Sequence, residues 1–277
     1  MHYVKGHGTG NDFVLLPDPD GTVQLTPRFV RAVCDRRAGI GADGVLRVVP
    51  SGAARADVAG GSHWFMDHRN ADGSPAEMCG NGLRLFAFFL VHSGLAELGQ
   101  QRIGTRSGVR EAVVEIDGTV RVDMGLAVPS GAAVARLGGE EYGGTRVSMG
   151  NPHLVCVTST PVKDLDLSSA PVTDAGAFPE GVNVEFVNLL DDVVPGADRH
   201  ILMRVHERGV GETQACGTGA CAAAVTVLAG SDGTVAVDQP GGRVHVTVDE
   251  GRAWLSGPAV IVGSGSLDPA WLTSVAG

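Results

Sequence analysis

Three short motifs occur twice in the same order along the chain, and this repetition constrains the fold more than any other feature. Each motif contains glycine and leads into an apolar stretch. The pairs are Gly10-Asn11 with Gly150-Asn151, GIGADGVL from Gly39 with GVNVEFVN from Gly181, and Cys-Gly-x-Gly from Cys79 with Cys-Gly-x-Gly from Cys216. The offsets between partners are 140, 142 and 137 residues. A nearly constant offset in one order predicts two similarly folded halves.

The segments after the two cysteine motifs, residues 83–95 and 220–230, are apolar nearly all round and end at glycine. A helix of this kind is buried on every side. We therefore expect each to be the central helix of a barrel-like lobe, with Cys79 or Cys216 at its N-terminus. Elsewhere, short apolar and β-branched segments bounded by Gly or Pro favour strands. The clearest strand segments are residues 119–128, 153–157, 181–190, 201–209, 243–251 and 259–265.

Length and composition limit the classes of protein to which the chain can belong. Its 277 residues are 43% hydrophobic, enough for about two compact units or one large one, and the repeated motifs favour two. The formal charge of −10 and the lack of a Lys/Arg cluster argue against nucleic acid as a partner. The N-terminus lacks the apolar region of a signal peptide, and no run approaches the roughly 18 apolar residues of a membrane span. Residues 51–63 and 158–180 are predicted surface excursions, and no role is assigned to them.

Cys79 and Cys216 are the candidate catalytic residues. A thiol at a helix N-terminus lies near backbone N–H groups and the positive end of the helix dipole, which predicts a pKa below the usual value of about 8.5. Two such thiols, one ionised and one protonated, could remove a proton from one face of an α-carbon and deliver one to the other. The helix-end amides would stabilise the enolate. The other cysteines, Cys34, Cys156 and Cys221, are predicted to be structural and reduced in a cytoplasmic protein, since five irregularly spaced cysteines form no disulfide framework.

No cofactor and no metal are predicted. The chain has no CxxC motif, and its nine histidines form no i,i+4 pair joined to further ligands, which disfavours a metal site. Pyridoxal phosphate needs a Schiff-base lysine, and the chain contains only Lys5 and Lys163. Gly39, Gly41 and Gly44 match GxGxxG but follow CDRRA rather than an apolar strand, which argues against a dinucleotide site.

Six sequence blocks spread over residues 5–225 are specific in combination. They are KGHGTGNDFVLL, CDRRAGIGADGVL, RNADGSPAEMCGNGLRLFAFFL, VSMGNPHLVCV, GVNVEFV and RVHERGVGETQACGTGACAAAV, with GPAVIVGSG at 257–265 as a closing block. These blocks resemble the signature blocks of the diaminopimelate epimerase family. The resemblance implies an α/β (α+β) fold of two pseudo-symmetric lobes, each a mixed or antiparallel sheet around a central helix. It places the N-terminal lobe at residues 1–118, with residues 264–277 returning to it, and the C-terminal lobe at residues 119–263.

The resemblance also implies the reaction, its cellular role and the residues that perform it. The reaction is cofactor-independent conversion of LL-diaminopimelate to the meso form, for lysine and peptidoglycan synthesis, and the expected assembly is a homodimer. The implied catalytic thiols are Cys79 and Cys216, and their protonation would be set with the help of His153 and Glu207, the latter also binding substrate. The carboxylate at the reacting carbon would be bound by Gly80, Asn81, Gly217 and Thr218. The distal amino-acid end would be held by Asn11, Asn70, Asn151, Asn183 and Arg208.

Three other interpretations stay open at this point. A proline or hydroxyproline racemase would share the fold and the two-cysteine mechanism, but its substrates have no second amino-acid end for Arg208 to bind. An isomerase of the same fold without thiol chemistry disagrees with the presence of Cys79 and Cys216. A thiol redox protein or a non-catalytic amino-acid-binding module would use the same cysteines without proton exchange. One departure from the family pattern is Gly44, where some members carry Gln, so no distal contact is assigned to it.

Overall fold

The chain forms two compact units, as seen in a computed structural model that describes residues 1–54 and 61–275. Unit 1 consists of residues 1–122 and 258–277, and unit 2 of residues 123–257. The chain thus leaves unit 1 once and returns to it once. The sequence predicts the two divisions at residues 118/119 and 263/264, a few residues away from these positions.

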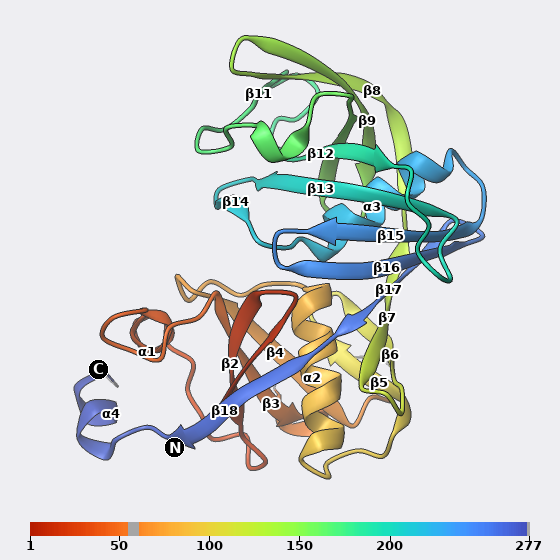
Figure 1. The fold of residues 1–277 in the computed structure, drawn as a ribbon. Coiled ribbons are helices and arrows are strands. Elements are labelled where there is room, and N and C mark those ends of the chain that lie inside the picture. Colours follow the sequence, from red (N-terminus) through yellow and green to blue (C-terminus); the bar gives the residue numbers. More distant parts are fainter. Residues whose placement is uncertain (55–60, 276–277) are drawn as a thin grey trace. The chain divides into compact units, whose positions relative to one another are not determined.

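Unit 1 is a mixed sheet with one long helix beside it (Figure 1). Its strands are β1 (His2–Gly8), β2 (Asn11–Pro17), β3 (Gly44–Pro50), β4 (Trp64–Asn70), β5 (Gly99–Thr105), β6 (Gly108–Val114), β7 (Thr119–Leu126, which runs on into unit 2) and β18 (Val260–Ser266). They pair in the order β18-β1-β2-β3-β4-β5-β6-β7, with β2–β3 and β4–β5 parallel and the other pairs antiparallel. The helices are α1 (Pro27–Cys34), the short 3-10 turn η1 (Ser51–Ala53), α2 (Gly80–His92) and α4 (Pro269–Val275).

Unit 2 repeats this arrangement with two additional short strands. Its strands are β8 (Val128–Leu137), β9 (Glu140–Ser148), β10 (Pro152–Val157), β11 (Val172–Thr173), β12 (Asn183–Leu190), β13 (Arg199–Glu207), β14 (Gly211–Thr213), β15 (Gly233–Gln239), β16 (Gly242–Asp249) and β17 (Arg252–Pro258). The main order is β8-β9-β10-β12-β13-β15-β16-β17, with β10–β12 and β13–β15 parallel and the other pairs antiparallel. The helices are the 3-10 turn η2 (Val162–Asp164) and α3 (Gly217–Leu228).

The matching topology confirms the duplication predicted from the sequence, and the strand registers fix which residues correspond. In unit 1, Phe13 pairs with Gly44 across the parallel strands β2 and β3. In unit 2, His153 pairs with Asn183 across the parallel strands β10 and β12. Two residues further along β3 and β12, Leu46 of unit 1 therefore corresponds to Glu185 of unit 2.

The two long helices are the central helices that the apolar segments predict. α2 contacts β1, β2, β3, β4, β6 and β18, and α3 contacts β9, β10, β12, β13, β15 and β16, so each helix is surrounded by strands of its own unit. Side chains such as Leu83, Phe86 and Leu90 of α2 are almost completely buried, and each contributes about 1.5–3 kcal/mol by leaving water. Among the described helices, none is both long and apolar enough to cross a membrane.

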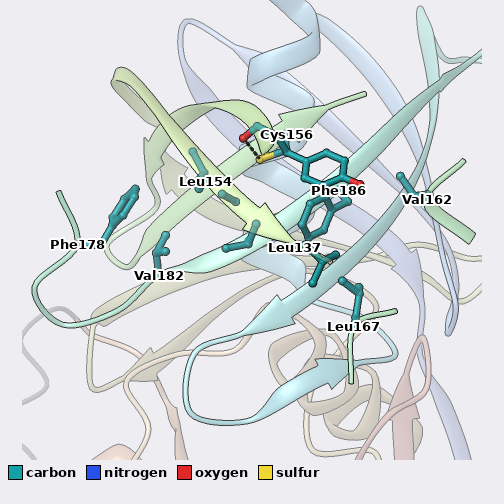
Figure 2. Packing of buried hydrophobic residues seen from close by; sticks show 11 residues of the cluster. Leu137, Leu154, Cys156, Val162, Leu167, Phe178, Val182 and Phe186 are labelled. Carbon is teal, nitrogen blue, oxygen red and sulfur yellow. Dashed lines mark hydrogen bonds between the residues drawn. The ribbon is translucent and has the colours of Figure 1, made fainter. Parts of the chain in front are cut away.

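Residues 158–180, to which the sequence analysis assigns no role, lie largely at the surface as predicted, but three of their side chains belong to the core of unit 2. Val162, Leu167 and Phe178 are buried in one hydrophobic cluster with Leu154 and Phe186 (Figure 2). Because neighbouring strand residues point to opposite faces, this segment covers the face of β10 and β12 that points away from α3. Its role is therefore to complete the core of unit 2. For the other predicted excursion, residues 51–63, the part at 55–60 lies outside the described residues.

Candidate active site

In unit 2, Cys216 is the N-cap residue of α3, as the Cys-Gly-x-Gly motif predicts. Its backbone is extended (φ −123°, ψ 113°), and its Sγ accepts a hydrogen bond from the backbone N–H of Gly219 at 3.4 Å. The backbone N–H of Cys216 donates to Oε1 of Gln239 at 2.9 Å. The residue is only 6% exposed. The backbone N–H of Gly219 thus points at the sulfur, while the protein excludes most water from it.

The expectation that the helix end lowers the thiol pKa is wrong for Cys216. Burial raises the pKa of Cys216 well above its ordinary value, and the negative charge of Glu207 raises it further. Hydrogen bonds from Thr218 and Gly219 act in the opposite direction but are weaker. Burial and the carboxylate of Glu207 outweigh the helix end because each of them disfavours the charged form of the sulfur. The surroundings of Cys216 therefore favour the protonated thiol.

A chain of hydrogen bonds links Cys216 to the interior of unit 2. Oγ1 of Thr218 lies 3.5 Å from Sγ of Cys216 and accepts from Nδ2 of Asn151 at 3.4 Å. Oδ1 of Asn151 lies 3.1 Å from Nε2 of His153, and Nδ1 of His153 lies 2.7 Å from Oε1 of Glu185. Three of the predicted site residues, Asn151, His153 and Thr218, are thus brought together beside Cys216. Glu185 joins them from β12.

Glu207, Asn183 and Arg208 lie around the end of β13. Asn183 is buried, and its Oδ1 accepts from the backbone N–H of Arg208 at 3.0 Å, which ties the exposed Arg208 to the start of β12. The guanidinium of Arg208 donates to the backbone carbonyl of Glu180 at 3.3 Å. Oε1 of Glu207 accepts from Oγ1 of Thr213 at 2.5 Å. The structure therefore groups these residues in unit 2, and the charge of Glu207 acts on Cys216 as described above.

In unit 1, Cys79 has the same place at the start of α2. Its backbone is extended (φ −138°, ψ 121°), and its Sγ accepts from the backbone N–H of Gly82 at 3.5 Å. The thiol donates to Oδ1 of Asn11 at 3.5 Å, and Nδ2 of Asn81 donates to the same oxygen at 3.4 Å. Asn11 in turn donates from Nδ2 to Asp43 at 2.8 Å, so its Oδ1 is directed at the sulfur. Asn11 thus contacts the thiol of Cys79 directly through its Oδ1.

The buried Arg84 orients Asn81. Its Nη2 donates to Oδ1 of Asn81 at 2.7 Å and to Oγ1 of Thr9 at 3.0 Å. The amide nitrogen of Asn81 must therefore face Asn11, which is the orientation that the hydrogen bond between them requires. Arg84 was not predicted from the sequence as a residue of this site, because it lies inside an apolar helix segment where an arginine has no evident partner.

The structure does not join every predicted residue of unit 1 to Cys79. Asn70 is exposed at the end of β4, and its amide donates to Oγ of Ser74 at 3.0 Å.

Gly44, which departs from the family pattern, has no room for a side chain. A Cβ atom there would lie 2.5 Å from the backbone oxygen of Arg69 and 3.3 Å from Nε2 of His68. A larger residue at this position would require the β3–β4 backbone to move.

Glu185 is the main residue that the sequence analysis missed. It is completely buried, and a Cβ atom on Gly219 would lie only 2.7 Å from its Oε1, so the carboxyl group packs against the first turn of α3. The available signal was a charged residue inside the apolar strand segment GVNVEFVNLL, since a carboxylate is rarely buried without a specific partner.

The other three cysteines behave as predicted for structural residues. Cys34 and Cys156 lie in separate hydrophobic clusters, and burial raises the pKa of each thiol to about 12. Cys221 is completely buried within α3. Thiols held in the neutral form behave as small hydrophobic side chains.

Two pockets in unit 2 differ in the side chains that line them. One of about 530 Å³ is lined by small and apolar residues such as Ala133 and Val155, with no titratable side chain. The other, of about 240 Å³, borders Asn151, His153 and Arg146. Because it borders Asn151 and His153, this second pocket adjoins the hydrogen bonds that lead to Cys216.

Within residues 1–54 and 61–275, no three His, Cys, Asp or Glu side chains are grouped so as to hold a metal ion.

Solved structures of other proteins have the same fold. A phenazine biosynthesis protein of the PhzF family from Bacillus anthracis superposes with a TM-score of 0.69 at 16% identity, covering 97% of this chain and 99% of that chain. A hydroxyproline epimerase from Agrobacterium vitis superposes with a TM-score of 0.65 at 15% identity, covering 98% and 94%. With its repeated topology and its two cysteine-capped helices, the chain is a protein of this duplicated, epimerase-type fold class.

A sequence profile of the family described as diaminopimelate epimerase matches residues 3–129 and 145–265, and the chain belongs to that family. The diaminopimelate epimerase of Thermobifida fusca is 49% identical over 274 residues, which are 96% of this chain and 98% of the relative. That of Mycolicibacterium smegmatis is 48% identical, with all of both chains covered. That of Streptomyces coelicolor is 46% identical, covering 99% of this chain and 97% of the relative.

Proposed function

We propose that this chain converts LL-diaminopimelate to the meso form without a cofactor, and that Cys79 and Cys216 exchange protons with opposite faces of one α-carbon. The observation that supports this assignment is the repeated setting of the two thiols. Each caps a buried helix, and each sulfur accepts a backbone N–H from the residue three positions further on. The family membership supplies the reaction, an epimerisation in lysine and peptidoglycan biosynthesis.

The proposed mechanism removes one proton from one face of the α-carbon and adds one proton to the other face. The thiolate of one cysteine takes the α-proton, and the electron pair left on carbon is delocalised into the substrate carboxylate as an enolate. The thiol of the other cysteine then gives its proton to the opposite face, so the protein ends with the two protonation states exchanged. The reverse reaction starts from that exchanged form. Because the surroundings of Cys216 favour its protonated thiol, Cys216 is suited to act as the proton donor.

The remaining predicted residues have roles in substrate binding under this proposal. The backbone N–H groups at Gly80, Asn81, Gly217 and Thr218 belong to helix first turns, where anions bind well. They would hold the carboxylate at the reacting carbon and stabilise the enolate. Arg208, with the amides of Asn70 and Asn183, would grip the distal carboxylate and ammonium groups. This distal recognition distinguishes a diamino diacid from a simple amino acid.

The assembly and location of the protein complete the proposal. The protein acts on a small molecule, and we place it in the cytoplasm because a reducing compartment keeps both catalytic thiols available for acid and base chemistry. A homodimer is the expected assembly. Light scattering on the purified chain at several concentrations measures the mass directly, and a mass of one chain at all concentrations would remove this part of the proposal.

The decisive experiment is incubation of the purified protein with LL-diaminopimelate in deuterated water under reducing conditions, without added cofactor. We expect the meso isomer to form and deuterium to enter at the α-carbon, because the proton delivered comes from a thiol that exchanges with solvent. If every α-proton is retained, the proposed epimerase activity is wrong.

Cysteine variants test the assignment of the two thiols. Cys79→Ala and Cys216→Ala should each lose inversion, by about 10²–10⁴-fold for the removal of one acid or base. The matched control is Cys34→Ala, which removes a buried thiol of unit 1 that has no proposed role and should leave the activity close to that of the natural chain. Full activity in either catalytic variant would overturn the role assignment.

Arg208→Ala separates this function from that of a proline racemase. Loss of diaminopimelate turnover is expected, because the distal end of the substrate loses a charged partner. A protein that racemises proline, and does so equally well with Arg208→Ala, would instead support the racemase interpretation.

A further inference from the structure

The buried pair formed by Glu185 and His153 lies directly under the first turn of α3. Both side chains have no exposed surface, and Oε1 of Glu185 is 2.7 Å from Nδ1 of His153. The same oxygen is the atom that a Cβ on Gly219 would meet. Placing a carboxyl group and an imidazole in the interior is unfavourable unless their hydrogen bonds are made. The pair therefore needs an explanation beyond packing.

The corresponding positions of unit 1 show that packing alone does not require a polar pair. The strand registers equate His153 with Phe13 and Glu185 with Leu46. A Cβ on Gly82, the counterpart of Gly219, would lie 3.4 Å from the side chain of Phe13 and 3.5 Å from that of Leu46. An apolar pair thus supports the helix of Cys79, whereas a polar pair supports the helix of Cys216. The asymmetry points to a task that only Cys216 needs.

The surroundings of Glu185 favour its neutral form. Its second oxygen, Oε2, is buried and has no hydrogen-bond partner among the described residues. An ionised carboxylate with one oxygen left in that position would be strongly disfavoured, whereas a neutral acid leaves only a carbonyl oxygen there. Burial raises the pKa of Glu185, and the charge of Glu207 raises it further against the opposing effect of His153. The titratable groups that face Glu185 are His153, Cys156, Glu207 and Cys216.

A proton on Glu185 fixes the direction of every hydrogen bond that follows. The acid donates to Nδ1 of His153, so the imidazole carries its proton on Nε2 and donates to Oδ1 of Asn151. The amide nitrogen of Asn151 donates to Thr218, whose hydroxyl hydrogen is then left to point at Sγ of Cys216. Every hydrogen bond in this series, from Glu185 to Thr218, therefore donates in the direction of the sulfur. These donors stabilise the negative charge when Cys216 becomes a thiolate.

We propose that Glu185 is a positioning residue: as a neutral acid it holds His153 in the Nε2–H form, and through Asn151 and Thr218 it directs a hydroxyl donor at Cys216. The role of Cys216 in this statement rests on the proposed function. The hydrogen-bond directions do not, because they can be measured in the protein without substrate.

Nitrogen-15 NMR of the histidine side chains tests those directions in the whole chain. We expect His153, assigned by its loss in His153→Phe, to show a protonated Nε2 and an unprotonated Nδ1 around neutral pH. Glu185→Gln should show the same form, since its amide nitrogen can also donate to Nδ1. An imidazole protonated on both nitrogens, or on Nδ1 alone, would overturn the proposal whether or not the protein is an epimerase.

Turnover measurements test what the chain of hydrogen bonds does. Glu185→Gln should keep kcat close to that of the natural chain. The double variant Glu185→Leu with His153→Phe reproduces the apolar pair of unit 1, so it should fold with an undiminished melting temperature, yet lose about 10- to 100-fold in kcat with little change in KM. Glu140→Gln, at an exposed position of β9 in the same unit, is the matched control and should change neither constant.

The possible outcomes are distinguishable. Full kcat in the double variant would overturn the proposal, because the polar pair would then be dispensable. If the double variant does not fold, the NMR spectra of the natural chain and of Glu185→Gln still decide whether His153 is held in the Nε2–H form. If the natural chain does not turn over diaminopimelate at all, the proposed function fails, while the protonation of His153 can still support or refute the assignment of Glu185.

Discussion

Adding a single methyl group to the first turn of each long helix should stabilise unit 1 but not unit 2. Gly82 and Gly219 are both the third residue of their helices, α2 and α3. On Gly82, a Cβ would make ordinary contacts at 3.4 Å and longer. On Gly219, it would lie 2.7 Å from Oε1 of Glu185 and 3.2 Å from its Cγ. The two substitutions to Ala therefore differ only in what the methyl group meets.

The magnitude follows from comparing the two variants. Replacing Gly by Ala inside a helix stabilises by about 1 kcal/mol, and this contribution is common to both, so it cancels in the comparison. To reach 3.4 Å, the carboxyl group of Glu185 must retreat by about 0.7 Å, which disrupts its hydrogen bond to His153. Disrupting a buried hydrogen bond costs about 1–3 kcal/mol. Gly219→Ala should therefore be about 1–3 kcal/mol less stable than Gly82→Ala.

Differential scanning calorimetry of both variants measures this difference, and it also resolves the two units if they unfold separately. At roughly 2–4 °C per kcal/mol for units of this size, Gly219→Ala should melt roughly 2–12 °C below Gly82→Ala. Equal melting temperatures, or a higher value for Gly219→Ala, would refute the tight packing of Glu185 against α3. That result would also weaken the role given to Glu185.

Three further predictions concern the core, the β3–β4 pair and the buried thiol. Leu167→Ala should destabilise unit 2 by about 2–5 kcal/mol in urea unfolding, because Leu167 is buried in the core cluster; a neutral effect would mean that residues 158–180 are dispensable. Gly44→Gln should lower the melting temperature, since its Cβ would lie 2.5 Å from the backbone oxygen of Arg69. Alkylation of Cys216, followed by mass spectrometry, should be slow at neutral pH because its pKa is raised. Removing the charge that raises this pKa, in Glu207→Gln, should lower it and speed the reaction; an unchanged rate would contradict the electrostatic effect.

Much of the architecture follows from patterns that involve only neighbouring residues. The repeated order of motifs predicts two similar halves, and the Cys-Gly-x-Gly turns followed by apolar segments predict two buried helices that begin at Cys79 and Cys216. A helix cap, a turn and the alternation of a strand depend on residues a few positions apart. These features are therefore readable from the sequence, and the structure confirms them.

The protonation of Cys216 depends instead on residues that come together only in the folded chain. Glu207 lies at the end of β13, and its charge acts on Cys216 at the start of α3 only in the folded chain. The local motif predicts a lowered thiol pKa, whereas burial and the carboxylate of Glu207 raise it. The sequence determined where the sulfur sits along its helix, but the tertiary structure decided the direction in which its pKa is shifted, because burial and electrostatic interaction depend on distance in space rather than along the chain.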